Sequence, residues 1–318
     1  MIQKIYQWIY IDCFNRSTLY FDTIGSLCLT IICYWTIGLA YTFVDLTERP
    51  QLIFRYRTQD KVVSWSDVIR TCKVVLFNQL VVTPIASVIF HYILEWRGID
   101  SSLTIPSGWI ILLHLILFTA IQEIAFYYLH RLLHHRWLYR TIHKMHHRWQ
   151  APIAIAAIYC HPSEHILGNL IPVLTGPFVL GSHRLTLLIW LIIIHFFTLN
   201  DHSGYHLPLF PSPEFHDYHH LKFNQNYGRM GLLDYLHGTS KQYFKSKQFK
   251  RHRVLFQLKP IREQELFELK QKNVLEIRQI RKSSYVNSNY PIQSMFKTLL
   301  EIIRKTSAQF FNVVSTSH

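Results

Sequence analysis

Apolar residues gather in three uninterrupted stretches of the chain, over roughly 24–44, 74–95 and 108–129. Each holds about twenty residues, and at a rise of about 1.5 Å per residue such a helix crosses a hydrocarbon layer of about 30 Å. A shorter apolar stretch covers roughly 185–200. The pattern predicts an all-α integral membrane protein with four to five transmembrane helices.

A further apolar region, 151–180, is interrupted by polar, glycine and proline residues, among them His161, Pro162, His165 and Pro177. Together with 185–200 it is expected to form a short, tilted or partly re-entrant pair. Polar groups at membrane depth are expensive and often functional. His161 and Glu164 are therefore candidates for lining a substrate channel or supporting a metal site, and a polar cap on a re-entrant turn is the structural alternative.

Basic residues alternate between the loops. Loops 45–73 and 130–150 and the region after 200 are rich in Lys and Arg, whereas 96–107 and 181–184 hold one arginine each. Basic loops favour the cytosolic side, which places the three basic regions there. We expect three parts: an N-terminal region with membrane helices (1–107), a catalytic domain (108–245) and a basic, partly amphipathic tail (246–318).

The tail contains two stretches that could form helices. One covers 262–281 and the other, which is amphipathic, covers 294–314. An interfacial or docking helix and a loosely ordered tail both agree with these patterns.

Composition supports the membrane assignment. Of 318 residues, 49% are hydrophobic and 16% are charged, against about 25% charged in soluble domains. The net charge of +14 would suggest nucleic acid in a soluble protein, but here it indicates a basic face against anionic lipid or an acidic electron carrier. The five cysteines form no CxxC pair, which argues against a disulfide framework or a thiolate metal site.

Histidine is the unusual residue, because fifteen of the twenty lie between positions 130 and 220. Ten of them form four groups with spacings of three or four residues, which place side chains on one face of a helix. The groups are His130 and His134; His143, His146 and His147; His202 and His206; and His216, His219 and His220.

These groups follow or precede apolar stretches on a single side of the membrane, so four helix ends can bring ten imidazoles together. Imidazole binds Zn, Cu, Fe and Ni, and ten ligands suit two ions with open positions. The absence of cysteine argues against a structural zinc or iron–sulfur site. Nearby carboxylates could orient the imidazole N–H groups: Glu123, Glu164, Asp201, Glu214 and Asp217.

The motifs "HRLLH", "HKMHH" and "HDYHH", with "DHSGYH" and "NYGRMGLLDYLHGT", resemble the fatty acid hydroxylase and sterol desaturase superfamily over about 110–242. The stretch "WQAPIAIAAIYCHPSEH" looks most like the fatty acid hydroxylase domain-containing proteins and somewhat less like sterol 4-methyl oxidases. The resemblance implies a histidine-rich dimetal site in a cytosolic helical cap, two Fe as the cofactor, and the ten histidines as ligands. It gives Asp234 an orienting role and leaves His135, His161, His165 and His237 outside the ligand set.

That resemblance implies a lipid hydroxylase in the endoplasmic reticulum membrane, acting with O2 on a C–H bond. With no dinucleotide fingerprint and no haem domain in the sequence, electrons would come from cytochrome b5 and an NAD(P)H reductase. A 4-methyl sterol is the first expected substrate, and a fatty acyl or ceramide-type lipid the second. Desaturation or aldehyde removal on the same scaffold stays open, as do a metal-handling membrane protein and a bis-histidine haem protein.

Overall fold

The computed structural model describes residues 1–60 and 62–286 and divides the chain into two compact units, Met1–Phe256 and Gln257–His318. The second unit contributes one described helix, α15 (Ile261–Val286), which confirms a helix over 262–281. The amphipathic stretch expected at 294–314 lies outside the described residues. The division at 107 and 245 stays a prediction.

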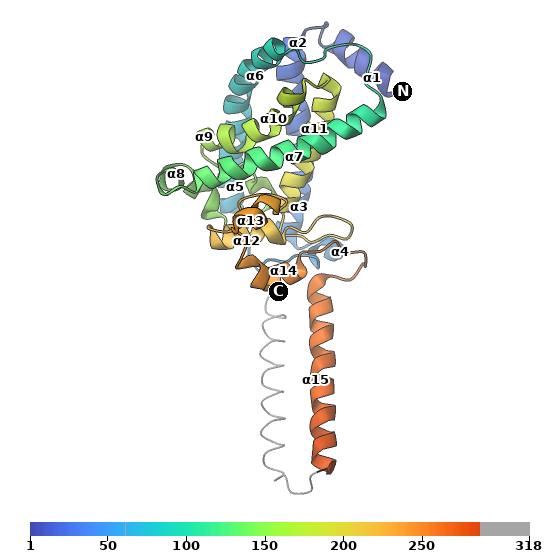
Figure 1. The fold of residues 1–318 in the computed structure, drawn as a ribbon, viewed down its shortest axis with the longest axis vertical. Helices are drawn as coiled ribbons and strands as arrows, with labels where there is room; N and C mark the ends of the chain where they lie inside the picture. Colours follow the sequence, from blue (N-terminus) through green and yellow to red (C-terminus); the bar gives the residue numbers. More distant parts are fainter. Residues whose placement is uncertain (61, 287–318) are drawn as a thin grey trace. The chain divides into compact units, whose positions relative to one another are not determined.

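The first unit is built from helices, and the described residues contain no named strand, so the all-α prediction is confirmed. Figure 1 shows α1 and α2 at one end of this unit and α12, α13 and α14 at the other. Its helices are α1 (Ile2–Trp8), α2 (Thr18–Tyr20), α3 (Ser26–Thr47), α4 (Gln51–Phe54), α5 (Trp65–Phe77), α6 (Thr83–Arg97), α7 (Gly108–Leu133), α8 (Arg136–Thr141), α9 (Pro162–Glu164), α10 (Ile171–Leu180), α11 (Arg184–Asp201), α12 (Glu214–Lys222), α13 (Leu232–His237) and α14 (Lys247–Arg251).

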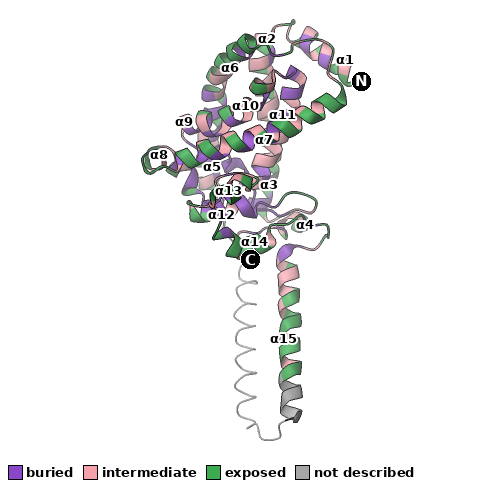
Figure 2. Cartoon of the chain, in the orientation of Figure 1, coloured by how far each residue is buried: buried purple, intermediate pink, exposed green. Residues whose placement is uncertain are grey.

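Four helical segments are long and apolar enough to cross a membrane: Thr18–Thr47, Trp65–Arg97, Gly108–Leu133 and Arg184–Asp201. The first two run on through π-helical turns, which join α2 to α3 and α5 to α6. Figure 2 shows exposed residues along these helices. Many of them are large and apolar, as expected for surfaces in contact with lipid. The chain is therefore a multi-pass membrane protein.

The interrupted region 162–180 extends from the histidine end of the bundle toward the end of α6. It begins at Glu164, beside the end of α7, and ends where Arg97 donates a hydrogen bond to the carbonyl oxygen of Val179. A π-helical turn over His165–Leu170 joins α9 to α10. The helix α10 packs against α7 at Gly176, where an added Cβ would lie 3.0 Å from the Cα of Phe118.

A buried polar cluster fastens the end of the bundle that lies away from the histidines. The guanidinium of Arg184, which is fully buried, donates from Nε to Asp22 at 2.8 Å and also binds Glu95. His91 lies 2.8 Å from the other oxygen of Asp22. Charges buried in this way are stable only when paired, so the cluster joins the start of α11 to α6 and to the segment before α3.

An apolar loop over 153–160 is almost completely buried at the histidine end of the bundle. The hydroxyl of Tyr34 donates to the carbonyl oxygen of Ile155 at 2.8 Å, and the amide of Asn78 donates to those of Ile158 and Cys160 at 3.1 and 3.0 Å. Hydrogen bonds from two transmembrane segments therefore satisfy this irregular backbone. The loop holds the segment carrying His143 to His147 against the bundle.

Candidate dimetal site

Nine of the ten predicted histidines converge into two groups. Within each group one ring nitrogen per histidine lies within 4.8 Å of all the others. We call them group A and group B. Group A contains His130, His134, His143, His147 and His219, and group B contains His146, His202, His216 and His220.

The two motifs with three histidines each supply both groups, which spacing alone did not indicate. The 3-10 helix His143–Arg148 sends His143 and His147 to group A and His146 to group B. Helix α12 likewise sends His219 to group A and the other two of its histidines to group B. Adjacent residues diverge around a helix, so a motif with adjacent histidines reaches both groups, whereas His130 and His134 both lie in group A.

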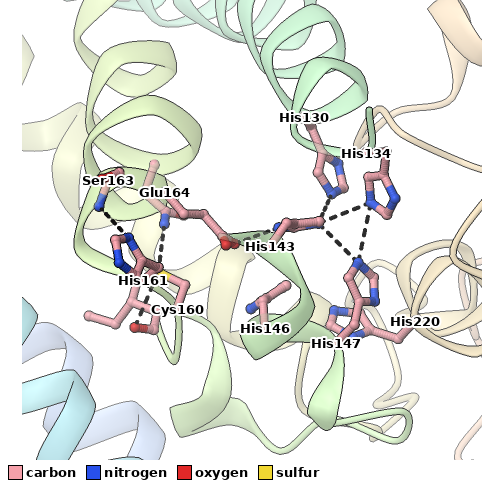
Figure 3. A network of polar contacts seen from close by, with 12 residues as sticks. His130, His134, His143, His146, His147, Cys160, His161, Ser163, Glu164 and His220 are labelled. Atoms are coloured by element: carbon pink, nitrogen blue, oxygen red, sulfur yellow. Dashed lines mark hydrogen bonds and ion pairs between the residues drawn. The ribbon is translucent and has the colours of Figure 1, made fainter. Parts of the chain in front are cut away.

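The Nε2 atoms of group A stand at the separations that a shared metal ion requires. His143 lies 2.9 Å from His134, 3.1 Å from His130 and 3.0 Å from His147. Zinc binds imidazole nitrogen at about 2.0–2.1 Å, so two ligands at right angles stand about 3 Å apart. Figure 3 shows His143 at the centre of these contacts.

Group B has similar separations. The Nε2 of His216 lies 3.0 Å from that of His202 and 3.1 Å from that of His220, and the Nε2 of His146 lies 3.4 Å from that of His202. The rings of His147 and His220, one from each group, have centroids 4.8 Å apart. The two groups are thus neighbours, which suits a pair of ions.

Backbone carbonyls fix the tautomers of four of these rings. A carbonyl only accepts, so each of these Nδ1 atoms carries the hydrogen and its Nε2 presents a lone pair. The pairs are His130 with Tyr227 at 2.6 Å, His219 with Gln225 at 2.6 Å, His202 with Thr198 at 2.8 Å and His220 with Trp149 at 2.8 Å. Lone pairs that converge in this way repel one another unless a cation lies between them, so the donor set fits metal binding.

Burial keeps these imidazoles neutral, as metal ligands must be. Desolvation lowers the pKa of His202 to about 4. Desolvation first, and neighbouring imidazoles second, lower the pKa of His143, His147 and His219 well below the ordinary value. The same causes lower the pKa of four further histidines of the two groups: His134, His146, His216 and His220.

Of the predicted orienting carboxylates, Glu164 contacts a grouped histidine, with its Oε1 2.8 Å from Nδ1 of His143 (Figure 3). Asp201 accepts from Arg229 Nε at 2.9 Å, and Asp217 accepts from Gln59 at 2.8 Å. Glu214 lies 3.7 Å from Arg251. Backbone carbonyl oxygens orient the rings of His130, His202, His219 and His220. Sequence reasoning did not consider these partners.

Two buried carboxylates hold the loop that orients His130. Asp234 accepts from the backbone N–H groups of Tyr227 and Gly228 at 2.8 and 2.7 Å. Glu123 accepts from those of Arg229 and Met230, both at 3.0 Å. The orienting role expected for Asp234 therefore acts through the Tyr227 carbonyl rather than through an imidazole.

The tenth predicted ligand, His206, lies outside both groups. Its Nε2 donates to the carbonyl oxygen of Arg253 at 2.6 Å. His161 caps α9 by accepting from the N–H of Ser163 at 3.2 Å, which favours the capping alternative. His165 lies 2.9 Å from the hydroxyl of Thr83, and His237 stacks on Tyr127.

One cavity adjoins the histidine groups, and a second shares part of its lining. The smaller, of about 60 Å³, is lined by histidines of both groups together with Glu164 and Arg229. The larger, of about 550 Å³, lies among α3, α6, α10 and α11, and we call it the chamber. Both are lined by Asn169, Val173, Ile194 and Thr198. A mainly apolar space between the transmembrane helices thus leads toward the site.

The chain is similar to known fatty acid hydroxylase proteins. Residues 115–239 match the family model described as fatty acid hydroxylase. The human fatty acid hydroxylase domain-containing protein 2 is 41% identical over 243 residues, which cover 76% of this chain and 73% of that protein. Very-long-chain aldehyde decarbonylase GL1-8 of Oryza sativa subsp. indica is 32% identical, covering 64% and 80%. Methylsterol monooxygenase 2-1 of Arabidopsis thaliana is 28% identical, covering 71% and 91%. No solved structure matches the chain.

Proposed function

Because the chain belongs to the fatty acid hydroxylase family, we propose that it is a membrane di-iron oxygenase that hydroxylates a C–H bond of a lipid. The observation that carries this proposal is the convergence of nine imidazoles into two adjacent groups. Two irons bound there would reduce O2 and supply the oxidant for an unactivated C–H bond.

Group A would hold one iron and group B the other, with the nine clustered histidines as ligands. Four imidazoles are held by backbone carbonyls and His143 by Glu164. These contacts fix the ring orientations before a metal arrives, and such partners typically contribute 10- to 100-fold to affinity. The small cavity is the space in which a lipid carbon would meet the site.

The substrate we favour is a sterol, with 4-methyl sterols first. The methylsterol monooxygenase relative aligns over 91% of its own length, and the chamber is large enough for one lipid of that kind. The chamber's apolar walls would exclude water and align the molecule, so that one carbon reaches the small cavity.

Electrons would come from cytochrome b5 and an NAD(P)H-linked reductase. The histidine end carries the loops rich in Lys and Arg, so we assign it to the cytosolic face of the endoplasmic reticulum membrane. Arg136, Arg140 and Lys144 lie on the segment between α7 and His146 and would attract an acidic electron carrier. Such an attraction weakens as ionic strength rises.

The test combines metal analysis with isotope incorporation. Purified protein in nanodiscs should hold two irons per chain, and with reductant and 18O2 it should add one labelled oxygen to a lipid. His147→Ala and His220→Ala, which remove one ligand from each group, should each abolish incorporation. An iron-loaded protein that consumes no oxygen with any membrane lipid would contradict the proposal.

A second outcome on the same scaffold is favoured by the relatives described as aldehyde decarbonylases. Desaturation or aldehyde removal needs the same site but gives a different product. Mass spectrometry separates them, because hydroxylation adds sixteen mass units whereas desaturation removes two. Lipid profiles of cells without this protein should show an accumulated substrate one oxygen lighter than the missing product.

A further inference from the structure

The polar lining of the chamber is rich in hydrogen-bond acceptors. Four hydroxyl groups of the lining donate to backbone carbonyls: Thr30 to Leu27 at 3.0 Å, Ser87 to Pro84 at 2.9 Å, Thr83 to Asn78 at 3.0 Å, and Tyr34 to Ile155 at 2.8 Å. A hydroxyl has a single hydrogen. These side chains therefore offer the chamber oxygen lone pairs and no free O–H.

His195 is the acceptor best placed for a ligand. It lies on α11 and lines the chamber, and its ring is 6.3 Å from that of Tyr34. Its Nδ1 donates to the carbonyl oxygen of Leu191 at 2.7 Å, which leaves Nε2 as a lone pair in the neutral ring. Among the described residues that Nε2 has no hydrogen-bond partner, and an unpaired polar atom in an apolar space is costly.

His195 lines the chamber and lies close to residues that line both cavities. It stands seven residues before His202 on α11, or about 10 Å along the axis at 1.5 Å per residue. Ile194 and Thr198, beside it and one turn on, line both cavities. In the other direction an apolar wall, which includes Leu187, Leu188 and Leu191, extends about 16 Å from His195 to Arg184.

We propose that His195 Nε2 accepts a hydrogen bond from a hydroxyl group of the lipid in the chamber. The lipid's apolar body then lies along α11 toward Arg184, and the carbon to be oxidised lies within about 10 Å of that hydroxyl. An ionised carboxylate has no hydrogen to donate. At His195 the chamber thus favours a hydroxyl lipid over a free fatty acid.

This inference deepens the proposed oxygenase function, but its test needs no turnover. The amides of Gln79 and Asn169 also line the chamber, so the experiment must show that a donor on the ligand, and not an acceptor, is what is recognised. Metal-free protein in nanodiscs is assayed for binding of two tritiated pairs: a 4-methyl sterol with its 3-methyl ether, and octadecan-1-ol with its methyl ether. Octadecanoic acid is the third probe.

Wild-type protein should bind the alcohol of at least one pair about three- to tenfold more tightly than its ether, the gain expected from one net hydrogen bond. His195→Phe should remove that preference while still binding the ether. His195→Gln, which keeps an acceptor, should restore part of it. His114→Phe, a matched change on α7 outside the chamber lining, should leave it unchanged.

Equal binding of alcohol and ether in both pairs, or no saturable binding of any, would overturn the inference. So would tighter binding of the acid, or a preference that survives in His195→Phe. Because no iron, oxygen or reductant is present, these outcomes are independent of oxygenase activity. Failure of the proposed function would instead appear as absent 18O incorporation in protein whose alcohol preference is intact.

Discussion

His130 donates its Nδ1 hydrogen to the carbonyl oxygen of Tyr227 at 2.6 Å, although 97 residues separate them along the chain. His130 lies in the last turn of the transmembrane helix α7. Tyr227 lies in a loop whose backbone N–H groups donate to Glu123 and Asp234. This contact links α7 to the loop that follows α12. The strength of the metal site should therefore depend on residues that hold no metal.

Gly228→Ala tests that dependence. An added Cβ would lie 2.6 Å from Oε1 of Glu123 and 2.9 Å from Oδ2 of Asp234, so the loop must shift and carry the Tyr227 carbonyl with it. Loss of such an orienting contact typically costs 10- to 100-fold in metal affinity. Competition with a chelator measures the change. Gly108→Ala, with open space around its added Cβ, is the matched control, and equal affinity in the two variants would contradict the prediction.

His206 should be dispensable for metal binding, unlike the clustered histidines. Its Nε2 is committed to the Arg253 carbonyl, so His206→Gln should keep two metals per chain. His219→Gln and His216→Gln should each lower the metal content toward one, because each removes a ligand from a different group. Elemental analysis after gel filtration gives these values. Loss of a metal from His206→Gln would return this residue to the ligand set.

Glu164→Gln should weaken group A more than group B. The carboxyl group lies 2.8 Å from Nδ1 of His143, and a carboxyl partner that accepts the Nδ1 hydrogen strengthens an imidazole as a ligand. The amide is similar in size and keeps an acceptor, so we expect about tenfold weaker binding of one metal with the fold intact. Calorimetric titration of metal-free protein would resolve the two binding steps. Equal weakening of both steps would contradict the assignment.

Metal-free protein should lose stability as the pH falls below about 6.5, the ordinary pKa of histidine. Burial lowers the pKa of His202 to about 4, so between these values the unfolded chain binds a proton that the folded chain does not. Stability is therefore full above the unfolded pKa and decreases on acidification, by up to about 1.4 kcal/mol per pH unit for each such histidine. Melting temperatures followed by tryptophan fluorescence measure this.

Bound metal should move that loss to lower pH, because protons and metal compete for the same nitrogens. A variant with Gln at positions 146, 202, 216 and 220 removes the four titrating rings of group B. Its metal-free form should show a shallower dependence on pH between about 6.5 and 4. A slope unchanged from that of the wild type would place the titrating groups elsewhere.

The sequence by itself determined the membrane crossings and the identity of nearly all converging side chains. The length of an apolar stretch predicts a transmembrane helix. His130 lies in the last turn of α7, and His202 directly follows α11. Helical spacing also predicted that His216, His219 and His220 all take part in the site, although His219 joins a different group from the other two. Both are local properties of the chain, so no long-range contact was needed to infer them.

Only the tertiary structure decided how those side chains divide and what surrounds them. Sorting His143 and His146 into different groups depends on the directions in which a 3-10 helix projects its residues against α7 and α12. Every residue has a backbone carbonyl, so the sequence does not show which carbonyls accept from His130 and His219. The exclusion of His206 and the chamber around His195 likewise depend on contacts between distant segments, which only packing of the whole bundle brings together.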